Sequence, residues 1–504
     1  MAEVYHLGQQ VWANYHKTAA CNLKDRIELA NSEELNGRSY LKSTAEAVLE
    51  LLKEAKQYDI PVRPIGAGWS PAPINIVEDG WLIETMRLNR TFKIDADDVH
   101  EDSVIAAEAL LLVQCGATVD EVYESAEELG RSLKTGGASN GQSFAGACAT
   151  GTHGSVWRQG GIQDHVRAVQ IVTPERILWV SSKQAVLSDD FVAQTGAELI
   201  RDDKIFAACQ LHVGALGFIT AMLIETDPIY MVRNIQKAVK INREHIDWLC
   251  EGSFTKFSRE FGLNEEPYFQ QLILNPFDPF DKKALLRFLY KRPYDASIPL
   301  PPPPKMGAGY DALTLLGKAM AGSDWFKADI LQMAMEKGYP KNMDVDDPEA
   351  IATWGNTTEE HAPIGNLFNG SVTLDRNELS EVFDLIINSF RDGGGGTVVT
   401  LRFLSKAQGL LAPARWDDNV VIDFDGPNVE SSHNGYKKVV DALDDAGIAF
   451  TRHWGKTNNL DERRVKRDYE QHFADWKWAQ LQIMPDESDR KVFASKELEK
   501  LGLI

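Results

Sequence analysis

A short glycine-containing segment, IPVRPIGAGWSPAP, could bind an anion through its main chain. Val62 and Ile65 predict a short strand, and Gly66 and Gly68, with prolines on both sides, predict a tight loop after it. Glycines let backbone N–H groups approach a phosphate with no Cβ in the way, and several such groups aimed at one point form an anion nest. The full GxGxxG fingerprint fails, because Pro71 stands at its last position and no helix is expected there. An ordinary loop would explain this segment equally well.

A second segment, TGGASNGQSFAGACATGTHGS at residues 135 to 155, is almost free of large side chains. This composition indicates that the main chain, rather than side chains, lies against something flat and extended, and a dinucleotide fits that description. The alternative is a flexible surface linker. Thr150, Thr152 and His153 stand among small apolar residues, however, which is not typical of a solvated Gly/Ser spacer. The sequence therefore favours a ligand at this loop.

A third segment, HWGK at residues 453 to 456, combines side chains that can move or stabilise charge. Lys456 could stabilise negative charge on a bound cofactor or polarise a substrate hydroxyl, while His453 could accept the proton of that hydroxyl. The alternative is a helix end with a solvated lysine near its last carbonyls. The segment alone does not decide between the two.

Regular elements must hold these segments in place. Ser43 and Glu46 form a capping box before an amphipathic helix, and Thr118 and Glu121 form a second one. VRAVQIV and ILWVSS predict a hairpin, and LHVGALGFITAMLIETDP predicts a glycine turn that leads into a long strand ending near residue 228. The first forty residues have no strong period, and we expect a short helix and connecting loops there.

The middle of the chain has a different character, with paired aromatic residues and the proline run LPPPPK. A helix is predicted near residues 378 to 390, alternating strands are predicted in TVVTLRFLSK and NVVIDFDG, and the tail from Tyr436 is expected to be helical. This pattern is typical of a mixed α+β domain with an antiparallel sheet. Glycines 393 to 396 are expected to be a helix end and turn, and prolines 301 to 304 a stiff loop.

Composition excludes several classes of function. With 504 residues, 43% apolar and 25% charged, the chain can bury a sizeable core, and no apolar run is long enough to cross a bilayer. A net charge of −21 repels phosphate backbones, which disfavours nucleic acid as a partner, and it indicates solubility rather than recognition of a cationic ligand. We expect a cytoplasmic protein, because no leader peptide is recognisable and the cysteines are few, odd in number and without a CxxC pair: Cys21, Cys115, Cys148, Cys209 and Cys250.

Taken together, these segments resemble the FAD-binding domain of the vanillyl-alcohol-oxidase family, also called the PCMH type. The matching pieces are PIGAGWS, FAGACATGTHGS, the VRAVQIVTPE hairpin and GALGFIT, within residues 41 to 228. GTHGS is similar to the alditol oxidase and aldonolactone oxidase branch. HWGK, followed by a tail ending in KVFASKELEKLGL, is similar to the C-terminal signature of that branch.

The resemblance implies an α+β fold class, in which a PCMH-type FAD-binding domain of two α/β subdomains is joined to a substrate domain with an antiparallel sheet flanked by helices. The expected organisation is an N-terminal segment 1–40, the FAD-binding domain 41–228, a substrate or cap domain 229–435 and a C-terminal segment 436–504 that returns to the FAD domain.

The resemblance also implies the site. We expect catalytic roles for His453, Lys456 and Arg402, with the histidine or an ordered water accepting the hydroxyl proton and the two cations holding the substrate oxygen. The residues expected to bind FAD are Ile65, Gly66, Ala67, Gly68, Trp69, Ser70, Gly136, Gly137, Ala138, Ser143, Gly146, Thr150, Gly151, Thr152, His153, Gly217 and Ile219.

Two positions depart from the family pattern. Relatives place a glutamate two residues before the arginine on a strand facing the flavin, whereas Thr400 stands there beside Arg402, which puts the usual recognition of sugar or lactone hydroxyls in doubt. Many relatives also bind FAD covalently through a histidine in the first loop. Trp69 occupies that position and cannot form the bond, and Cys148 does not align with the cysteine that berberine-bridge-type relatives use, so the resemblance implies dissociable FAD. Trp69 could stack beside the flavin or simply pack.

A third position bears on oxygen. Relatives that react poorly with O₂ commonly carry alanine at the start of the second loop, where Gly137 stands here. This favours an oxidase that removes a hydride from a hydroxyl-bearing carbon of a small organic molecule and is reoxidised by O₂. The alternatives are a dehydrogenase of an aldonolactone or secondary-metabolite alcohol with another acceptor, or a non-catalytic flavin-binding module.

The remaining histidines, including His165, His212 and His361, are expected to be structural, because none pairs with carboxylates at the spacing of metal ligands. No metal is predicted. The sequence names neither the substrate, nor the group that replaces the missing glutamate, nor the oligomeric state.

Overall fold

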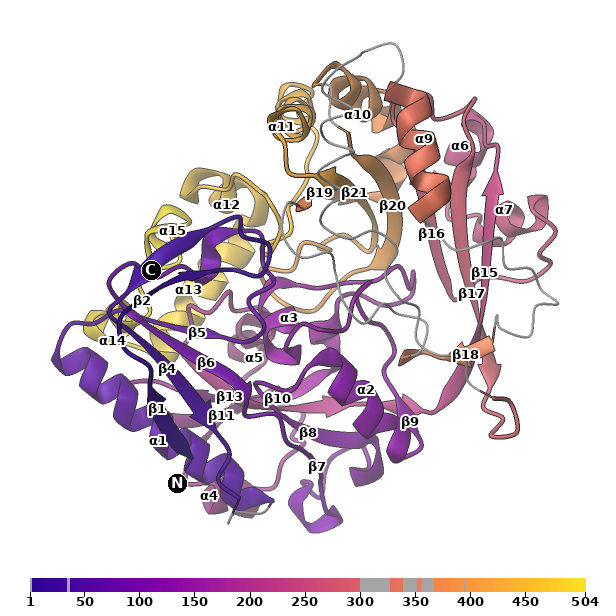
Figure 1. The fold of residues 1–504 in the computed structure, drawn as a ribbon. Coiled ribbons are helices and arrows are strands. Elements are labelled where there is room, and N and C mark those ends of the chain that lie inside the picture. The colour runs from indigo at the N-terminus through magenta and orange to yellow at the C-terminus, as the bar shows by residue number, and fades with distance from the viewer. Residues whose placement is uncertain (1, 34–36, 300–326, 339–350, 356–366, 394–395) are drawn as a thin grey trace.

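The computed structural model describes residues 2–33, 37–299, 327–338, 351–355, 367–393 and 396–504. The chain folds into an N-terminal half with two large sheets and two short strand pairs, and a second half built on one seven-stranded sheet; the C-terminal helices return to the first half (Figure 1). Prolines 301 to 304 and His361 lie outside the described residues.

The first sheet has four strands in the order β1-β4-β6-β5, with β1 antiparallel to β4 and the other pairs parallel. The expectation of a short helix before residue 40 is wrong, because this segment supplies β1 and β4 to the sheet and forms a separate hairpin, β2-β3. These strands are only four to six residues long, which is too short to give a strong period in the sequence. The strands are β1 (Glu3–His6), β2 (Gln10–Ala13), β3 (Ala20–Leu23), β4 (Asp25–Ala30), β5 (Val62–Ile65) and β6 (Trp81–Arg87).

The second sheet has six strands in the order β12-β11-β10-β13-β8-β7. Its centre is the predicted hairpin β10-β11 and the long strand β13, whose residues are buried almost throughout. The hairpin and the long strand are both confirmed. The strands are β7 (Thr91–Lys93), β8 (Leu110–Gln114), β10 (Val166–Val172), β11 (Ile177–Ser181), β12 (Glu198–Arg201) and β13 (Phe218–Glu225), and a short pair, β9 (Arg131–Ser132) and β14 (Asp227–Pro228), lies beside this sheet.

Helices pack against these two sheets. Helix α1 buries Leu41, Ala45, Val48 and Leu52 along one face, as the 3.6-residue period predicts, although it begins earlier than the Ser43 capping box and that box is not its N-terminus. Helix α2 begins with the predicted capping box of Thr118. The helices of this half are α1 (Arg38–Gln57), α2 (Val119–Glu128), α3 (Phe144–Thr150), α4 (Asp189–Gln194) and α5 (Asp203–Gln210).

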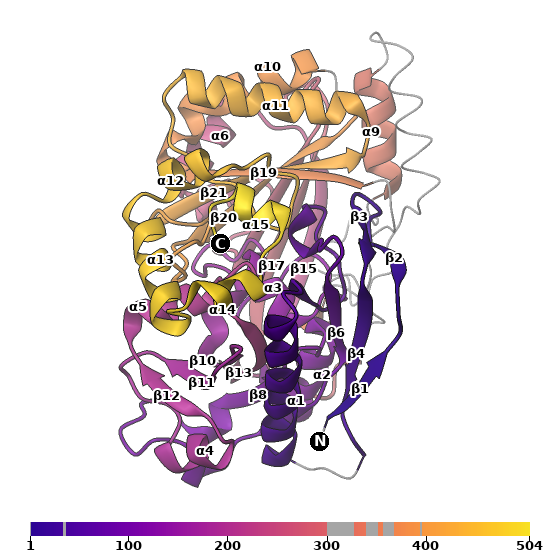
Figure 2. The same cartoon turned by 90° about the vertical axis from the view of Figure 1, so that its left-hand side faces the viewer.

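The second half is a seven-stranded sheet in the order β18-β15-β17-β16-β20-β21-β19, in which all pairs are antiparallel. Helices α10 and α11 cover one of its faces (Figure 2). The strands are β15 (Tyr230–Val239), β16 (Phe269–Leu274), β17 (Ala284–Pro293), β18 (Ile351–Thr353), β19 (Leu367–Asp375), β20 (Val398–Ser405) and β21 (Asp418–Pro427). The helices are α6 (Arg243–Cys250), α7 (Phe254–Glu260), α9 (Lys327–Gly338), α10 (Leu379–Gly393) and α11 (Glu430–Asp445).

Alternation in this sheet separates a helix-covered core from a polar face. In β21, Val420, Ile422 and Phe424 join the core beneath the helices, while Asp423 and Asp425 point to the opposite face. The antiparallel sheet with flanking helices confirms the fold class predicted from the sequence.

The C-terminal helices α12 (Glu462–Tyr469), α13 (Gln471–Ile483), α14 (Glu487–Val492) and α15 (Lys496–Lys500) pack beside the N-terminal half (Figures 1 and 2). Gln480 in α13 donates a side-chain hydrogen bond to the carbonyl of Ala215 at 2.8 Å and another to that of Leu503 at 2.8 Å. Buried Trp476 adds apolar contact to the N-terminal core. The last segment therefore fixes the loop that precedes β13.

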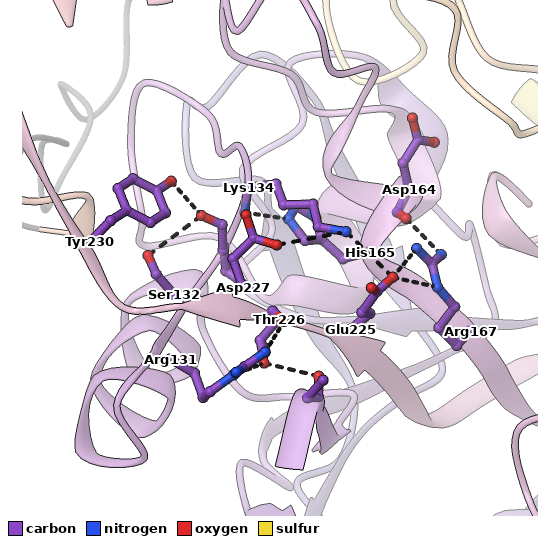
Figure 3. Close-up of polar contacts among 12 residues, drawn as sticks. Arg131, Ser132, Lys134, Asp164, His165, Arg167, Glu225, Thr226, Asp227 and Tyr230 are labelled. Atoms are coloured by element: carbon purple, nitrogen blue, oxygen red, sulfur yellow. Dashed lines mark hydrogen bonds and ion pairs between the residues drawn. The ribbon is translucent and has the colours of Figure 1, made fainter. Parts of the chain in front are cut away.

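A cluster of polar and charged side chains stabilises the region where the chain passes from the six-stranded sheet to the seven-stranded sheet (Figure 3). Lys134 lies 3.4 Å from a carboxylate oxygen of Glu225 and 3.9 Å from one of Asp227, and Glu225 also pairs with Arg167. His165 accepts from the Lys134 main-chain N–H at 2.8 Å, and its Nδ1 lies 2.9 Å from the carbonyl of Ile162. Burial lowers the pKa of His165 to about 4. This histidine is neutral and structural, as predicted.

Among the described residues, no helix combines the length and the apolar character needed to cross a bilayer.

Candidate cofactor and active site

A cavity of about 970 Å³ runs between the N-terminal half and the polar face of the seven-stranded sheet. It is lined by both glycine-rich segments, by the HWGK segment and by residues of β15, β16, β17, β20 and β21. Its volume is at the upper end of the usual range for ligand sites. All residues predicted to bind FAD line it except Gly136, Gly151 and Gly217.

Glycine is required at these three positions by close packing or by backbone conformation around the cavity. A Cβ on Gly136 would lie 2.1 Å from the hydroxyl of Tyr123, Gly151 ends α3 in the left-handed conformation, and Gly217 has a φ of +112°. The second segment is also not one continuous loop, because Phe144–Thr150 form the short helix α3, capped by Ser143, whose hydroxyl accepts from Gly146 N–H at 3.3 Å. The small residues that suggested a loop are there packed as a helix.

The two glycine-rich segments touch at Gly66 and Ser143. Strand β5 delivers Gly66, and a Cβ there would lie only 1.9 Å from Ser143 Oγ and 2.5 Å from its Cβ. Both residues line the cavity. Only glycine at position 66 therefore lets the two segments approach this closely.

Gly66→Ala should weaken FAD binding about tenfold, or about 1.4 kcal/mol, because the added methyl group forces the segments apart. Titration of the FAD-free protein with FAD, followed by flavin fluorescence, measures this. Ser143→Gly in the same chain removes the colliding side chain and should recover part of the affinity. Unchanged FAD affinity in Gly66→Ala would show that the contact does not shape the cofactor site.

Trp69 both packs and lines the cavity. Its ring stacks on Tyr15 with centroids 4.7 Å apart and planes at 25°, and the Tyr15 main-chain N–H donates to the carbonyl of Gly68 at 2.9 Å. The N-terminal segment therefore fixes the side chain of Trp69 at the edge of the cavity.

The HWGK segment lies against both cofactor segments. The carbonyl of Gly455 accepts from Ala72 N–H at 3.2 Å, and a Cβ on Gly455 would lie 3.2 Å from Ser70 Oγ and from Thr150. The rings of His153 and His453 have centroids 5.7 Å apart. Sequence positions 66–70, 150–153 and 453–456 thus meet at one place.

Both of these histidines are neutral at ordinary pH. Burial lowers the pKa of His153 to about 4, and burial together with Lys456 lowers the pKa of His453 well below its usual value. The Nδ1 of His453 accepts from Gly455 N–H at 3.0 Å, and the ring also hydrogen-bonds to the main chain of Gly151.

Arg402 and Lys456 both pair with one carboxylate, that of Asp423, which was not identified from the sequence. Asp423 is completely buried, with Oδ1 2.5 Å from Lys456 Nζ and Oδ2 3.1 Å from Arg402 Nε. It lies directly across from Thr400 in the β20-β21 register. Burial alone would raise the pKa of Asp423, but Lys456 and Arg402 hold it well below the ordinary value. A sequence pattern that could have revealed Asp423 is present in NVVIDFDG, where aspartates recur with period 2 inside an apolar strand.

A second carboxylate, Asp425, follows on the same face of β21 and lines the cavity. It lies opposite Asn369 of β19, whose side-chain amide donates to it. Burial and the charge of Asp423 raise the pKa of Asp425. Strand β21 therefore carries two aspartates whose pKa values are shifted in opposite directions, and Asp425 is the one that lines the cavity.

The surroundings of Arg63 indicate whether the cavity suits a dinucleotide. It is 3% exposed and lines the cavity, and its guanidinium donates to the carbonyls of Gly214 at 2.7 Å and Val213 at 3.3 Å, while Nε has no partner. Burial lowers its pKa to about 10, so it stays charged, and no carboxylate of the described residues pairs with it. A buried cation of this kind requires an anion, which the diphosphate of FAD would supply.

Comparison with known proteins agrees with this geometry. Residues 41–179 match the family model described as an FAD binding domain. The chain is 24% identical over 208 residues to D-arabinono-1,4-lactone oxidase of Debaryomyces hansenii, covering 41% of this chain and 34% of that protein. It is 28% identical over 190 residues to L-gulonolactone oxidase of Scyliorhinus torazame, covering 38% of this chain and 37% of that protein. The matches span about a third of the length of these relatives.

Solved structures share the fold over nearly the whole chain. Cholesterol oxidase from Brevibacterium sterolicum superposes with a TM-score of 0.69 at 14% identity, covering 99% of this chain and 97% of that one. Xylooligosaccharide oxidase from Myceliophthora thermophila C1 superposes with a TM-score of 0.60 at 13% identity, covering 96% and 92%. The resemblance read from PIGAGWS and GTHGS is confirmed.

Proposed function

We propose that this chain, in which residues 41–179 are an FAD binding domain, is an FAD-dependent oxidase that removes a hydride from a hydroxyl-bearing carbon of a small organic molecule. The observation that carries the proposal is the continuous cavity that joins the glycine-rich cofactor segments to Arg402 and Lys456. The names of relatives that share the FAD-binding region or the fold, lactone oxidases and cholesterol oxidase, support this class of reaction.

FAD, when bound, supplies the acceptor for the hydride. The protein's own side chains stabilise the charge that develops on the substrate oxygen. Arg402 and Lys456 share one buried carboxylate, so together with Asp423 they carry one net positive charge beside the cavity, which stabilises an oxygen as its hydroxyl loses a proton. Neutral His153 and His453 add no charge to compete with it.

FAD is held without a covalent bond in this proposal, since Trp69 replaces the histidine that links the flavin in many relatives. Acid precipitation of the purified protein should leave the yellow colour in solution. Colour in the pellet would indicate a covalent link elsewhere in the chain.

The basic experiment is to record the visible spectrum before and after adding candidate alcohols without oxygen. We expect a yellow protein that is bleached by an alcohol substrate and recovers its colour in air. A protein that binds FAD but is bleached by no alcohol would favour the non-catalytic alternative, and slow recovery in air would favour a dehydrogenase with another acceptor.

Gly137 is the residue through which oxygen access can be tested. It lines the cavity, and a Cβ on it would lie 2.9 Å from Thr152 Cγ2. Gly137→Ala should slow the reoxidation of dithionite-reduced protein by O₂ about tenfold, or about 1.4 kcal/mol of activation free energy. Stopped-flow mixing with oxygenated buffer measures the rate without any substrate.

Because the added methyl group needs room, Gly137→Ala is best combined with Thr152→Ser, and Thr152→Ser alone reports what the second change does by itself. An unchanged reoxidation rate in the double variant would mean that O₂ does not approach past position 137.

The proposal includes a cytosolic location. All five cysteines are buried and free, and a reducing compartment would keep them so. Cell fractionation with an antibody against the protein tests this part.

A further inference from the structure

Removing a hydride from an alcohol carbon also requires an acceptor for the hydroxyl proton. The acceptor must line the cavity and have a free lone pair. Lys456 and Arg402 do not qualify, because both are cations held by Asp423. Asp423 is itself completely buried and is not part of the cavity lining.

His453 is poorly placed for this role. Its Nδ1 already accepts from Gly455 N–H, and the ring also hydrogen-bonds to the main chain of Gly151. His153 lies next to it, with Nδ1 3.1 Å from the carbonyl of Gly154. Protonation of either histidine would place a second positive charge near Lys456, and the repulsion between the two charges disfavours protonation of both rings.

Asp425 meets the requirements. It lines the cavity, it lies two residues beyond Asp423 on the same face of β21, and Asn369 on the neighbouring strand donates to its Oδ1. The Asn369 bond fixes the carboxyl group while leaving its second oxygen for a ligand. The charged groups that face it are Asp423 on its own strand, Arg402 on β20 and Lys456 on the HWGK segment.

The two aspartates are electrostatically different. Two cations keep Asp423 ionised at all ordinary pH values, whereas burial and the nearby negative charge of Asp423 raise the pKa of Asp425. A raised pKa makes a carboxylate a better proton acceptor near neutral pH, and pairs of groups with pKa values pushed apart mark acid and base roles.

We propose that Asp425 is the catalytic base that accepts the proton of the substrate hydroxyl. This assignment rests on the proposed oxidase function. The O–H bond breaks and its proton moves to the Asp425 carboxylate, while the electron pair of the C–H bond leaves as hydride to the flavin and a C=O bond forms. O₂ would then take up the two electrons together with the hydrogen carried as hydride and one proton from solvent, so that hydrogen peroxide is released, while Asp425 returns the proton it accepted to solvent.

Asp425 also answers a question that the sequence left open. The strand position expected to hold a glutamate is Thr400, which is buried and lies across from Asp423. The two aspartates nearest to Arg402 and Lys456 therefore lie on β21, whereas β20 carries a threonine at the position expected to hold the glutamate.

The test compares the wild type with Asp425→Asn, Asp425→Glu and the control Asp417→Asn, which changes an exposed aspartate just before the same strand. The probes are D-arabinono-1,4-lactone, L-gulono-1,4-lactone, cholesterol and xylobiose, and the rate of flavin bleaching is followed by anaerobic stopped flow. In Asp425→Asn we expect the rate to fall at least about 100-fold. Asp425→Glu should recover part of it, and Asp417→Asn should match the wild type.

Two further readouts separate a catalytic from a structural role. FAD affinity and reoxidation by O₂ of the dithionite-reduced protein should be unchanged in Asp425→Asn. The wild-type bleaching rate should fall as pH drops through the raised pKa of Asp425, and this acid limb should be absent in Asp425→Asn. A pH titration of the oxidised flavin spectrum needs no substrate, and the same ionisation should disappear in the variant.

The outcomes are distinguishable. If no probe bleaches the wild type and its flavin spectrum does not titrate in the acid range, the oxidase function and the Asp425 assignment both fail. If a probe bleaches wild type and Asp425→Asn at similar rates, or if the acid limb persists in the variant, the assignment to Asp425 is overturned while the oxidase function stands. Persistence of the limb would point to His153.

Discussion

Asp423→Asn should lower the free energy of unfolding by about 3–5 kcal/mol, which is typical when one partner of a buried ion pair is removed. The change keeps the size of the side chain but leaves Arg402 and Lys456 without their shared carboxylate. Because Asp423 is completely buried, solvent cannot replace it. The two cations would also repel each other, so we expect loss of substrate-dependent bleaching even in protein that remains folded.

Urea unfolding measures the loss, and Asp418→Asn is the matched control on the same strand. Asp418 pairs with Arg376 at 2.9 Å but is 40% exposed, so its substitution should cost less than about 1 kcal/mol. Equal losses in the two variants would mean that the buried pair contributes no more than a surface one.

The stability difference between wild type and Asp423→Asn should also depend on pH. Lys456 and Arg402 depress the pKa of Asp423 in the folded state, so its contribution is fully present above about pH 4, where an unfolded aspartate ionises. The contribution should shrink as pH falls further. A difference that grew toward acid pH would contradict the assigned ion pairs.

The elements that hold the site could largely be predicted from local sequence. The Thr118 capping box, the hairpin after Val166 and the alternating strands around Arg402 follow from period and capping, which act over a few residues. Both glycine-rich segments were also found, because close approach of backbone requires small residues. Strands β1 to β4 were missed. Strand β4 is stabilised by pairing with distant β6, β1 is stabilised by pairing with β4, and β1 carries little alternation of its own.

The site itself could be predicted only in part. The three residues expected to be catalytic, His453, Lys456 and Arg402, do line one cavity, but the aspartates beside them on β21 were not recognised. Asp423 matters because strand register places it beside Arg402 and because a segment 33 residues later brings Lys456 to it. Register and long-range return of the chain are properties of the folded state, and one sequence does not contain a local signal for them.

Arg63 is the strongest example of a residue whose role only burial reveals. In the sequence it is one cation in a short strand, whereas in the structure it is a buried charge among carbonyls at the cofactor cavity. Arg63→Met should raise the dissociation constant of FAD at least about 100-fold, or about 2.7 kcal/mol, because the buried positive charge proposed as the partner of the diphosphate is lost. Arg63→Lys keeps the charge and should lose less.

Riboflavin separates this effect from a change of cavity shape, because it carries the isoalloxazine ring without the diphosphate. We expect Arg63→Met to bind riboflavin nearly as the wild type does, so that the preference for FAD collapses. The FAD-free variant should also lose less stability than the FAD-bound one, since the methionine removes an uncompensated buried charge from the empty site. Equal weakening of FAD and riboflavin would mean that Arg63 shapes the loop at Val213 and Gly214 and does not serve as the counter-charge of the diphosphate.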